Sequence, residues 1–225
     1  MAPPVAEGRS ASPRWPFWLG LFVLGLAWLG PLPRLTHHSF AAHMVLHVTV
    51  VAVAAPLIAI GISECRCNLL CRLPPAMTVV CASLLELIVV WAWHAPVLRN
   101  AASGSMAIFI VEQASFLAVG LVLWLAAFAT RADGRRAMAG VIALLLTSMH
   151  MTLLGALLGL SLRPLFHHGH AGALGLTPLE DQHIGGIVML AVGGLAYLAG
   201  GLALIARLLR DGPAPVQPAV PAGEG

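Results

Sequence analysis

Histidine side chains gather at one end of a long apolar stretch, residues 37–61 (HHSFAAHMVLHVTVVAVAAPLIAIG). His43 and His47 are four residues apart, so in a helix both rings would leave the same face, one turn apart. Two imidazoles in that arrangement can share a metal ion, each supplying one nitrogen. Hydrogen bonds to neighbouring helices would explain the pair equally well, so the spacing alone allows a metal site without requiring one.

Methionine sulfur lies close to imidazole along the chain. Met44 adjoins His43, and a later apolar run contains the triplet Met149-His150-Met151. Thioether and imidazole ligands together suit Cu(I). Methionine inside a membrane is also an ordinary packing residue, so this pattern leaves the identity of the metal open.

The elements that position these ligands must be membrane helices, because the chain is too apolar for a soluble domain. Of its 225 residues, 59% are hydrophobic and 9% are charged, whereas a soluble domain carries about 25% charged residues. Lysine is absent, and the net charge of +3 comes from arginines beside the apolar runs. That placement indicates membrane topology and gives no reason to expect a nucleic-acid partner.

Six apolar runs are candidate membrane spans, since crossing a hydrocarbon core of about 30 Å takes roughly 20 residues. Lipid permits only helices or closed barrels, and these runs are too long for barrel strands. We therefore predict an all-α, polytopic bundle of six helices over residues 15–210. A flexible segment (1–14) would precede it, and a disordered Pro/Gly-rich tail (211–225) would follow. The predicted spans are 15–30, 39–62, 76–93, 105–128, 137–162 and 182–209.

The arginines predict how this bundle is oriented. Nine of the twelve fall at one end of the predicted spans, and Arg34, Arg99 and Arg163 fall at the other. Because arginine is enriched on the cytoplasmic side, we expect both termini in the cytoplasm. The histidines then collect at the outer end, where His94 closes the third span, and His150 alone lies near mid-membrane.

Two carboxyl groups, Glu86 and Glu112, lie within the predicted spans. Ionisable groups inside a bilayer are costly and are therefore candidates for a functional role. We expect Glu112 either to be protonated and hydrogen-bonded or to pair with a nearby charge.

Two loop clusters could also handle metal. Cys65, Cys67 and Cys71 crowd into one predicted cytoplasmic loop, but their spacing is not the Cys-x-x-Cys of structural zinc sites. Residues 167–170 (HHGH) lie in an outer loop and could gather metal loosely or simply be solvated. For both clusters the spacing leaves chance and metal handling open.

Three ordered blocks resemble the caa3-type cytochrome c oxidase assembly factors, the CtaG-like family. The first is His43-Met44-x-x-His47 with Pro56, Leu57 and Gly61, and the second is WAWHAPVL, residues 91–98. The third is residues 179–190 (LEDQHIGGIVML), through Asp181, Gln182, Gly185, Gly186 and Met189. The likeness spans residues 39–210. It departs from the family pattern at Gln113, where a Glu-His pair is expected, and at Gly61-Ile62-Ser63, which replaces a Gly-x-Pro.

The resemblance implies an assembly factor, not an enzyme, in the bacterial plasma membrane. It would bind copper, with Cu(I) favoured, at the outer face and deliver it to an oxidase subunit. Its expected partners are the lipid bilayer and that subunit, and a homo-oligomer is one state that the sequence allows. The expected metal-site residues are His43 and His47 as core ligands, then His94, His150, Asp181, His183, Met44 and Met151.

Other functions stay open on the sequence. In a metal transporter, outer histidines, His150 and the cysteines would form a relay across the bilayer. In a b-type cytochrome, His43 and His47 could not clasp one haem from opposite faces, so His94 or His150 would be needed. A hydrolytic metalloenzyme is a third alternative, although the chain has no His-Glu-x-x-His motif.

Overall fold

The computed structural model describes residues 14–62, 75–128, 134–166 and 175–210, which form helices and contain no strand. The predicted all-α class is therefore confirmed for this part of the chain. Several predictions fall on residues that it does not describe: the cysteine cluster Cys65, Cys67 and Cys71, the histidine tract 167–170, and the terminal segments 1–13 and 211–225.

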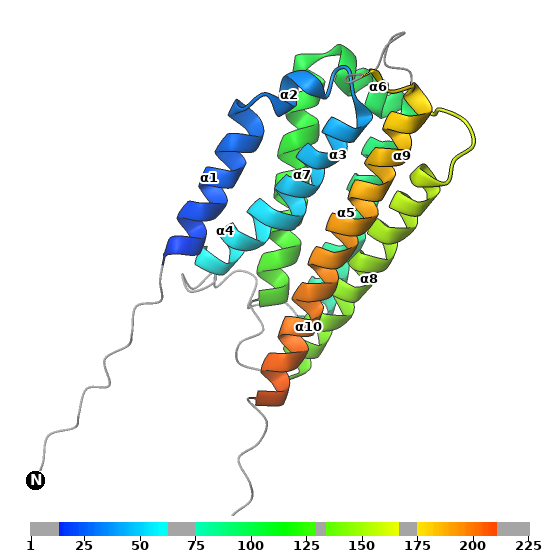
Figure 1. Cartoon of the computed structure of the whole chain (residues 1–225). Helices are drawn as coiled ribbons and strands as arrows, with labels where there is room; N and C mark the ends of the chain where they lie inside the picture. The colour runs from blue at the N-terminus through cyan, green and yellow to red at the C-terminus, as the bar shows by residue number, and fades with distance from the viewer. Residues whose placement is uncertain (1–13, 63–74, 129–133, 167–174, 211–225) are drawn as a thin grey trace, which may run out of the picture.

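The helices run up and down one bundle (Figure 1). The chain begins with α1 (Trp15–Leu29) and the short α2 (Leu32–Leu35). A continuous rod follows, made of α3 (Phe40–Val48), the π-helical segment η1 (Thr49–Ala54) and α4 (Ala55–Ile62). Three further helices, α5 (Pro75–His94), α7 (Met106–Phe128) and α8 (Gly134–Gly159), are long, and α6 (Pro96–Gly104) is short. A second rod closes the bundle: α9 (Pro178–Val188), the π-helical η4 (Met189–Gly193) and α10 (Gly194–Arg210).

Five of these elements are long and apolar enough to cross a membrane. Each lies within a few residues of a predicted span. The first predicted span corresponds to α1, which has 15 residues and is about 22 Å long at 1.5 Å per residue. Because that falls short of the hydrocarbon thickness of about 30 Å, the count of six spans stays a prediction. The five are Phe40–Ile62, Met77–His94, Met106–Phe128, Ala137–Gly159 and Pro178–Arg210.

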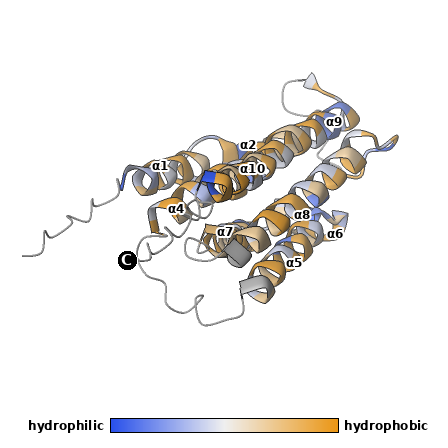
Figure 2. Ribbon diagram, turned by 90° about the horizontal axis from the view of Figure 1, so that it is seen from below, coloured by the Kyte–Doolittle hydropathy of each residue, from blue (hydrophilic) through white to orange (hydrophobic). Residues whose placement is uncertain are grey.

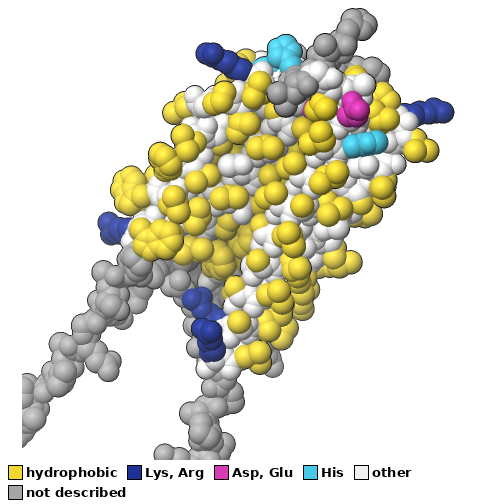
Figure 3. Space-filling view, viewed as in Figure 1, with side chains coloured by type: hydrophobic (Ala, Val, Ile, Leu, Met, Phe, Trp, Pro, Cys, Tyr) yellow, Lys and Arg dark blue, Asp and Glu magenta, His cyan; other side chains and the backbone are white. Residues whose placement is uncertain are grey.

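The surface of the bundle suits a bilayer. Hydrophobic side chains cover the long face in view, and charged side chains lie at its two ends (Figure 3). Hydrophilic colours likewise concentrate near the ends of helices, at the start of α9 and the end of α10 (Figure 2). Large apolar side chains such as Ile88 and Leu195 are more than 60% exposed, which suits contact with lipid and not with water.

A carboxylate from one rod fixes where the other rod begins. Asp181 of α9 accepts hydrogen bonds from Ser39 Oγ at 2.6 Å, Phe40 N at 2.5 Å and Ala41 N at 3.2 Å. Ser39 is itself the N-cap of α3, since its side chain accepts from Ala42 N. The first turn of α3 is therefore held by α9, and the next two turns carry His43 and His47.

A proline sets the geometry in the middle of the first rod. In η1, Ala55 N donates to Val50 O, and the next residue, Pro56, has no N–H to donate. The carbonyl of Val51 instead accepts from Trp124 Nε1 of α7 at 2.9 Å and from Tyr197 Oη of α10 at 3.4 Å. The single hydroxyl proton of Tyr197 is shared between this carbonyl and the buried carboxyl of Glu86, so this polar group within a span has a partner.

Glycines let α8 and α9 approach each other closely. A Cβ on Gly186 would meet backbone atoms of Gly159 and Gly155, which cannot move aside as the end of a flexible side chain can. Small residues at a helix crossing allow the close packing that replaces the hydrophobic effect inside lipid. The position of Asp181, one and a half turns earlier on α9, therefore depends on this crossing.

We predict that Gly186→Ala destabilises the protein by about 2 kcal/mol, because an added methyl forces α8 and α9 apart. Gly25→Ala is the matched control, since a Cβ at Gly25 in α1 meets nothing within 4 Å. Thermal unfolding in detergent measures both. Equal melting temperatures for the two variants would contradict the close crossing.

Candidate metal centre

Three histidines from two helices meet inside the bundle. His43 and His47 come from successive turns of α3, and His94 is the last residue of α5. The ring centroids are 5.2 Å apart for His47 and His94, 6.0 Å for His43 and His94, and 6.5 Å for His43 and His47. Phe116 of α7 packs against all three, most closely against His47 at 4.2 Å. We call His43, His47 and His94 the histidine cluster.

Two members of the cluster carry ring nitrogens that are buried without a hydrogen bond. Neither nitrogen of His47 has a partner among the described residues, and the side chain is 0% exposed. His94 Nδ1 lies 2.6 Å from Val90 O, so it must carry the proton that it donates to this carbonyl. His94 Nε2 is then left with a lone pair and no partner within the described chain. Such nitrogens are suited to bind a cation.

The spacing of the rings can be compared with what one ion would need. A nitrogen about 2.0–2.1 Å from a metal puts its ring centroid about 3.2 Å away, so two rings at tetrahedral or trigonal angles stand about 5.2–5.5 Å apart. The pair His47–His94 meets this spacing, while His43 lies about 0.5–1.3 Å too far out. Accordingly, no group of three His, Cys, Asp or Glu residues within the described ranges already has the geometry of a metal site.

A buried ion pair lies beside the cluster. Arg99 of α6 approaches both carboxylate oxygens of Glu112, at 3.4 and 3.5 Å, and donates to Thr36 O at 2.8 Å. Glu112 Oε1 is also 3.8 Å from His43 Nε2. Burial lowers the pKa of the Arg99 guanidinium from its ordinary value, and the Glu112 carboxylate opposes that shift. Of the two alternatives left open for Glu112, the structure shows the pairing with a nearby charge.

Comparison with known proteins identifies the family of this chain. Residues 6–211, nearly the whole chain, match the family model described as cytochrome c oxidase caa3 assembly factor. The chain belongs to this family. No curated protein and no solved structure matches it. The resemblance carried by the three sequence blocks is therefore confirmed, and membership supports a role for this assembly factor in building the oxidase.

The structure places the other predicted site residues of this assembly factor in different surroundings. The carboxylate of Asp181 is engaged with the start of α3, and His183 Nε2 lies 2.8 Å from Ser161 O. Met44 points toward Gly185 of α9, and Met151 faces Gly193 of η4. Both methionines are buried, Met44 where α3 meets α9 and Met151 where α8 meets η4.

His150 lies deeper in the bundle than the cluster. It lines a cavity of about 430 Å³ between α5 and α8, together with Ser83 and Leu87. Leu87 is seven residues before His94, which is about 10 Å along a helix. Of the eight predicted site residues, the structure thus brings together His43, His47 and His94.

Two neighbours of the cluster could not be assigned to it from the sequence. Arg99 counted only as one of three arginines at the outer end, and nothing in its spacing predicted a fully buried side chain. Phe116 is one apolar residue among many in its span. Glu112 did carry a signal, because a carboxyl in an apolar run requires a partner.

We predict that Arg99→Met and Glu112→Leu each destabilise the protein by about 3–5 kcal/mol, since each leaves one buried charge without its partner. The double variant removes both charges, so its loss of stability should be much smaller than the sum of the losses in the two single variants. Thermal unfolding of the four proteins completes the cycle, with exposed Arg34→Met as the control. Strictly additive losses would show that the two residues do not interact.

Proposed function

We propose that this assembly factor binds one Cu(I) ion through His43, His47 and His94 and passes it to an oxidase subunit. It would act as a carrier in the bacterial plasma membrane and catalyse no reaction. The observation that carries this proposal is the set of buried, unpartnered nitrogens on His47 and His94. A buried polar group without a partner costs free energy, and bound metal would remove that cost.

Closing the site requires a small movement. His47 and His94 already stand at the separation that one ion needs, and His43 must approach them by about 1 Å. Three-coordinate imidazole binding leaves room for a fourth ligand from an acceptor, which is how an ion can be exchanged.

The choice of copper rests on family membership as well as on ligand chemistry. Imidazole binds several first-row metals, with copper(II) the tightest of the divalent series. A site that delivers to a haem-copper oxidase favours copper over zinc. The Arg99–Glu112 pair beside His43 is neutral overall, so a buried monovalent ion leaves one uncompensated charge where a divalent ion leaves two.

We expect an oxidase subunit that accepts the copper ion to reach the histidine cluster from the end of the bundle that carries α2 and α6. In Figure 1 these two short helices lie at the same end as the start of α3. His94 ends α5, and Ala95 and Pro96 lead directly into α6. The arginine distribution predicts this end to face outward, where an oxidase subunit could receive the ion.

We predict that the purified protein binds one Cu(I) per chain and that His47→Ala or His94→Ala lowers this ratio at least about tenfold, since each removes a ligand. His43→Ala should weaken binding as well, with a smaller effect because its ring lies furthest out. Exposed His38→Ala, at the same end of the bundle, is the matched control.

Copper is counted by elemental analysis and by competition with a colorimetric Cu(I) chelator. An unchanged copper ratio in both His47→Ala and His94→Ala would reject the site. A second outcome would reject only the delivery step. In that case the wild type binds copper, the His47→Ala variant does not, and cells with this variant still contain an oxidase with its full copper content.

A further inference from the structure

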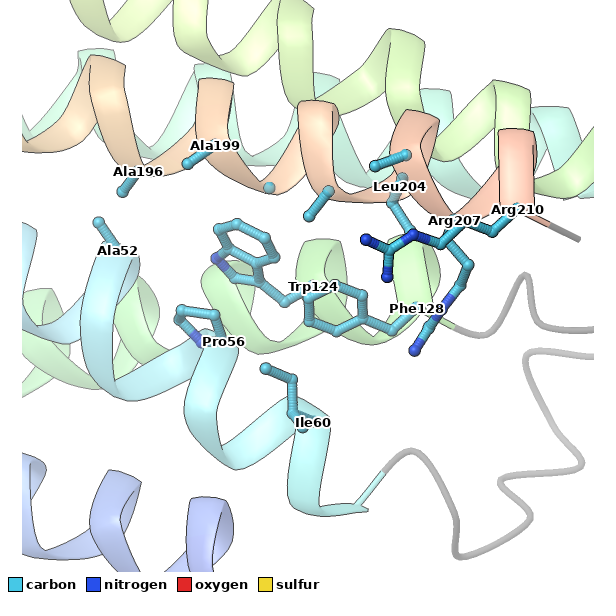
Figure 4. A pocket seen from close by; sticks show the side chains of 13 residues that line it. Ala52, Pro56, Ile60, Trp124, Phe128, Ala196, Ala199, Leu204, Arg207 and Arg210 are labelled. Atoms are coloured by element: carbon cyan, nitrogen blue, oxygen red, sulfur yellow. The ribbon is translucent and has the colours of Figure 1, made fainter.

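An apolar groove opens at the opposite end of the molecule from the histidine cluster. It has a volume of about 840 Å³ and lies between α4, α7 and α10. Pro56 and Ile60 form one wall, and Trp124 and Phe128 form the floor (Figure 4). The proposed copper site uses none of these residues.

Small side chains on α10 make room for the groove. Ala196, Ala199, Gly200 and Ala203 recur at helical spacing and form the second wall. No larger side chain from these positions reaches across toward α4, so an open trough remains where helices would otherwise interdigitate. The trough runs parallel to the axis of α10.

The groove carries positive charge at one end. Arg207 and Arg210, in the last turn of α10, line its mouth, and both guanidinium groups lie at the Phe128 end (Figure 4). None of the 13 lining residues is acidic. The groove is therefore amphipathic, with an apolar body and two guanidinium groups at the membrane boundary.

We propose that this groove binds an anionic phospholipid. Its acyl chains would lie along the alanine face of α10 against Trp124, and its phosphate would be held by Arg207 and Arg210. Guanidinium groups bind phosphate oxygens in a bidentate manner, and basic pockets between membrane helices suit anionic headgroups. The end of the bundle rich in arginine is the one predicted to face the cytoplasm, where the leaflet carries anionic lipid.

A transmembrane helix from a partner is the main rival occupant, because small residues often mark helix–helix contacts. Two observations favour the lipid. The volume lies within the range of about 300–1,000 Å³ that is typical of small-ligand sites. The two arginines have no carboxylate among the lining residues, and an apolar helix would leave them unmatched.

The test measures phospholipid binding by native mass spectrometry of the purified full chain, with phosphatidylglycerol and phosphatidylethanolamine of identical acyl chains. We expect the wild type to prefer phosphatidylglycerol. R207Q/R210Q should raise the apparent Kd for this lipid about tenfold or more, and should weaken phosphatidylethanolamine less, because its ammonium group offsets the phosphate charge. Ala199→Leu narrows the groove and should weaken both lipids.

Two matched controls separate this groove from the general lipid shell. Arg14→Gln removes an arginine at the same end but outside the groove, and Ala107→Leu enlarges an exposed alanine at the other end. Both should bind as the wild type does. If R207Q/R210Q fails to fold, the same binding measurement is made with R207K/R210K and with Ala199→Leu.

Equal wild-type affinity for the two lipids, or phosphatidylglycerol binding that is the same in wild type and in R207Q/R210Q, would overturn the proposal and leave only lipid of the general shell. Cross-linking of a protein helix to a photoreactive residue placed at position 199, in lipid-free protein, would overturn it in favour of the rival.

Discussion

The carboxylate of Asp181 holds together the part of the molecule on which the proposed site depends. Inside lipid, backbone groups must be satisfied by the protein itself, and the first turn of a helix has free N–H groups. Asp181 accepts from Phe40 N, Ala41 N and Ser39 Oγ, and so joins α9 to the start of α3. His43 and His47 follow within two turns. Their positions relative to α5 and α7 are therefore fixed from across the bundle, by a residue that is not in the cluster.

Polar groups around the cluster are satisfied in part. Arg99 contacts Glu112 and Thr36 O, and the Val51 carbonyl accepts from Trp124. Arg99 Nε and Gln113 Oε1 also lack a hydrogen bond within the described chain, but other atoms of these two side chains are hydrogen-bonded, whereas neither ring nitrogen of His47 is. Since an unsatisfied polar group within hydrocarbon is costly, selection for stability alone would favour an apolar residue at position 47. A ligand for the nitrogens is the simplest reason to retain histidine there.

Sequence reasoning succeeded where a single helix determines the answer and failed where packing between helices does. Apolar length identified five spans to within a few residues, and the spacing of His43 and His47 placed them on one helix face. The same reasoning placed His150 near mid-membrane but also included it among the metal-site residues, and the structure places it beside Leu87 on the wall of a separate cavity. Residues 39 and 181 are 142 positions apart, and no periodicity could reveal that Asp181 caps α3 instead of facing the cluster. The burial of Arg99 likewise depends on residues far away in sequence, Thr36 at the end of α2 and Glu112 of α7.

The rod from Phe40 to Ile62 connects the two ends of the molecule that we consider functional. Its first two turns carry two of the three clustered histidines, and its last turns form a wall of the groove. Between them, Pro56 leaves the Val51 carbonyl to Trp124, a residue that also forms the groove floor. Any other residue at position 56 would have a backbone N–H that competes with Trp124 for that carbonyl and weakens the hold on the indole. The proline therefore does more than interrupt a helix, because it commits α7 to a fixed register against the rod that bears His43 and His47.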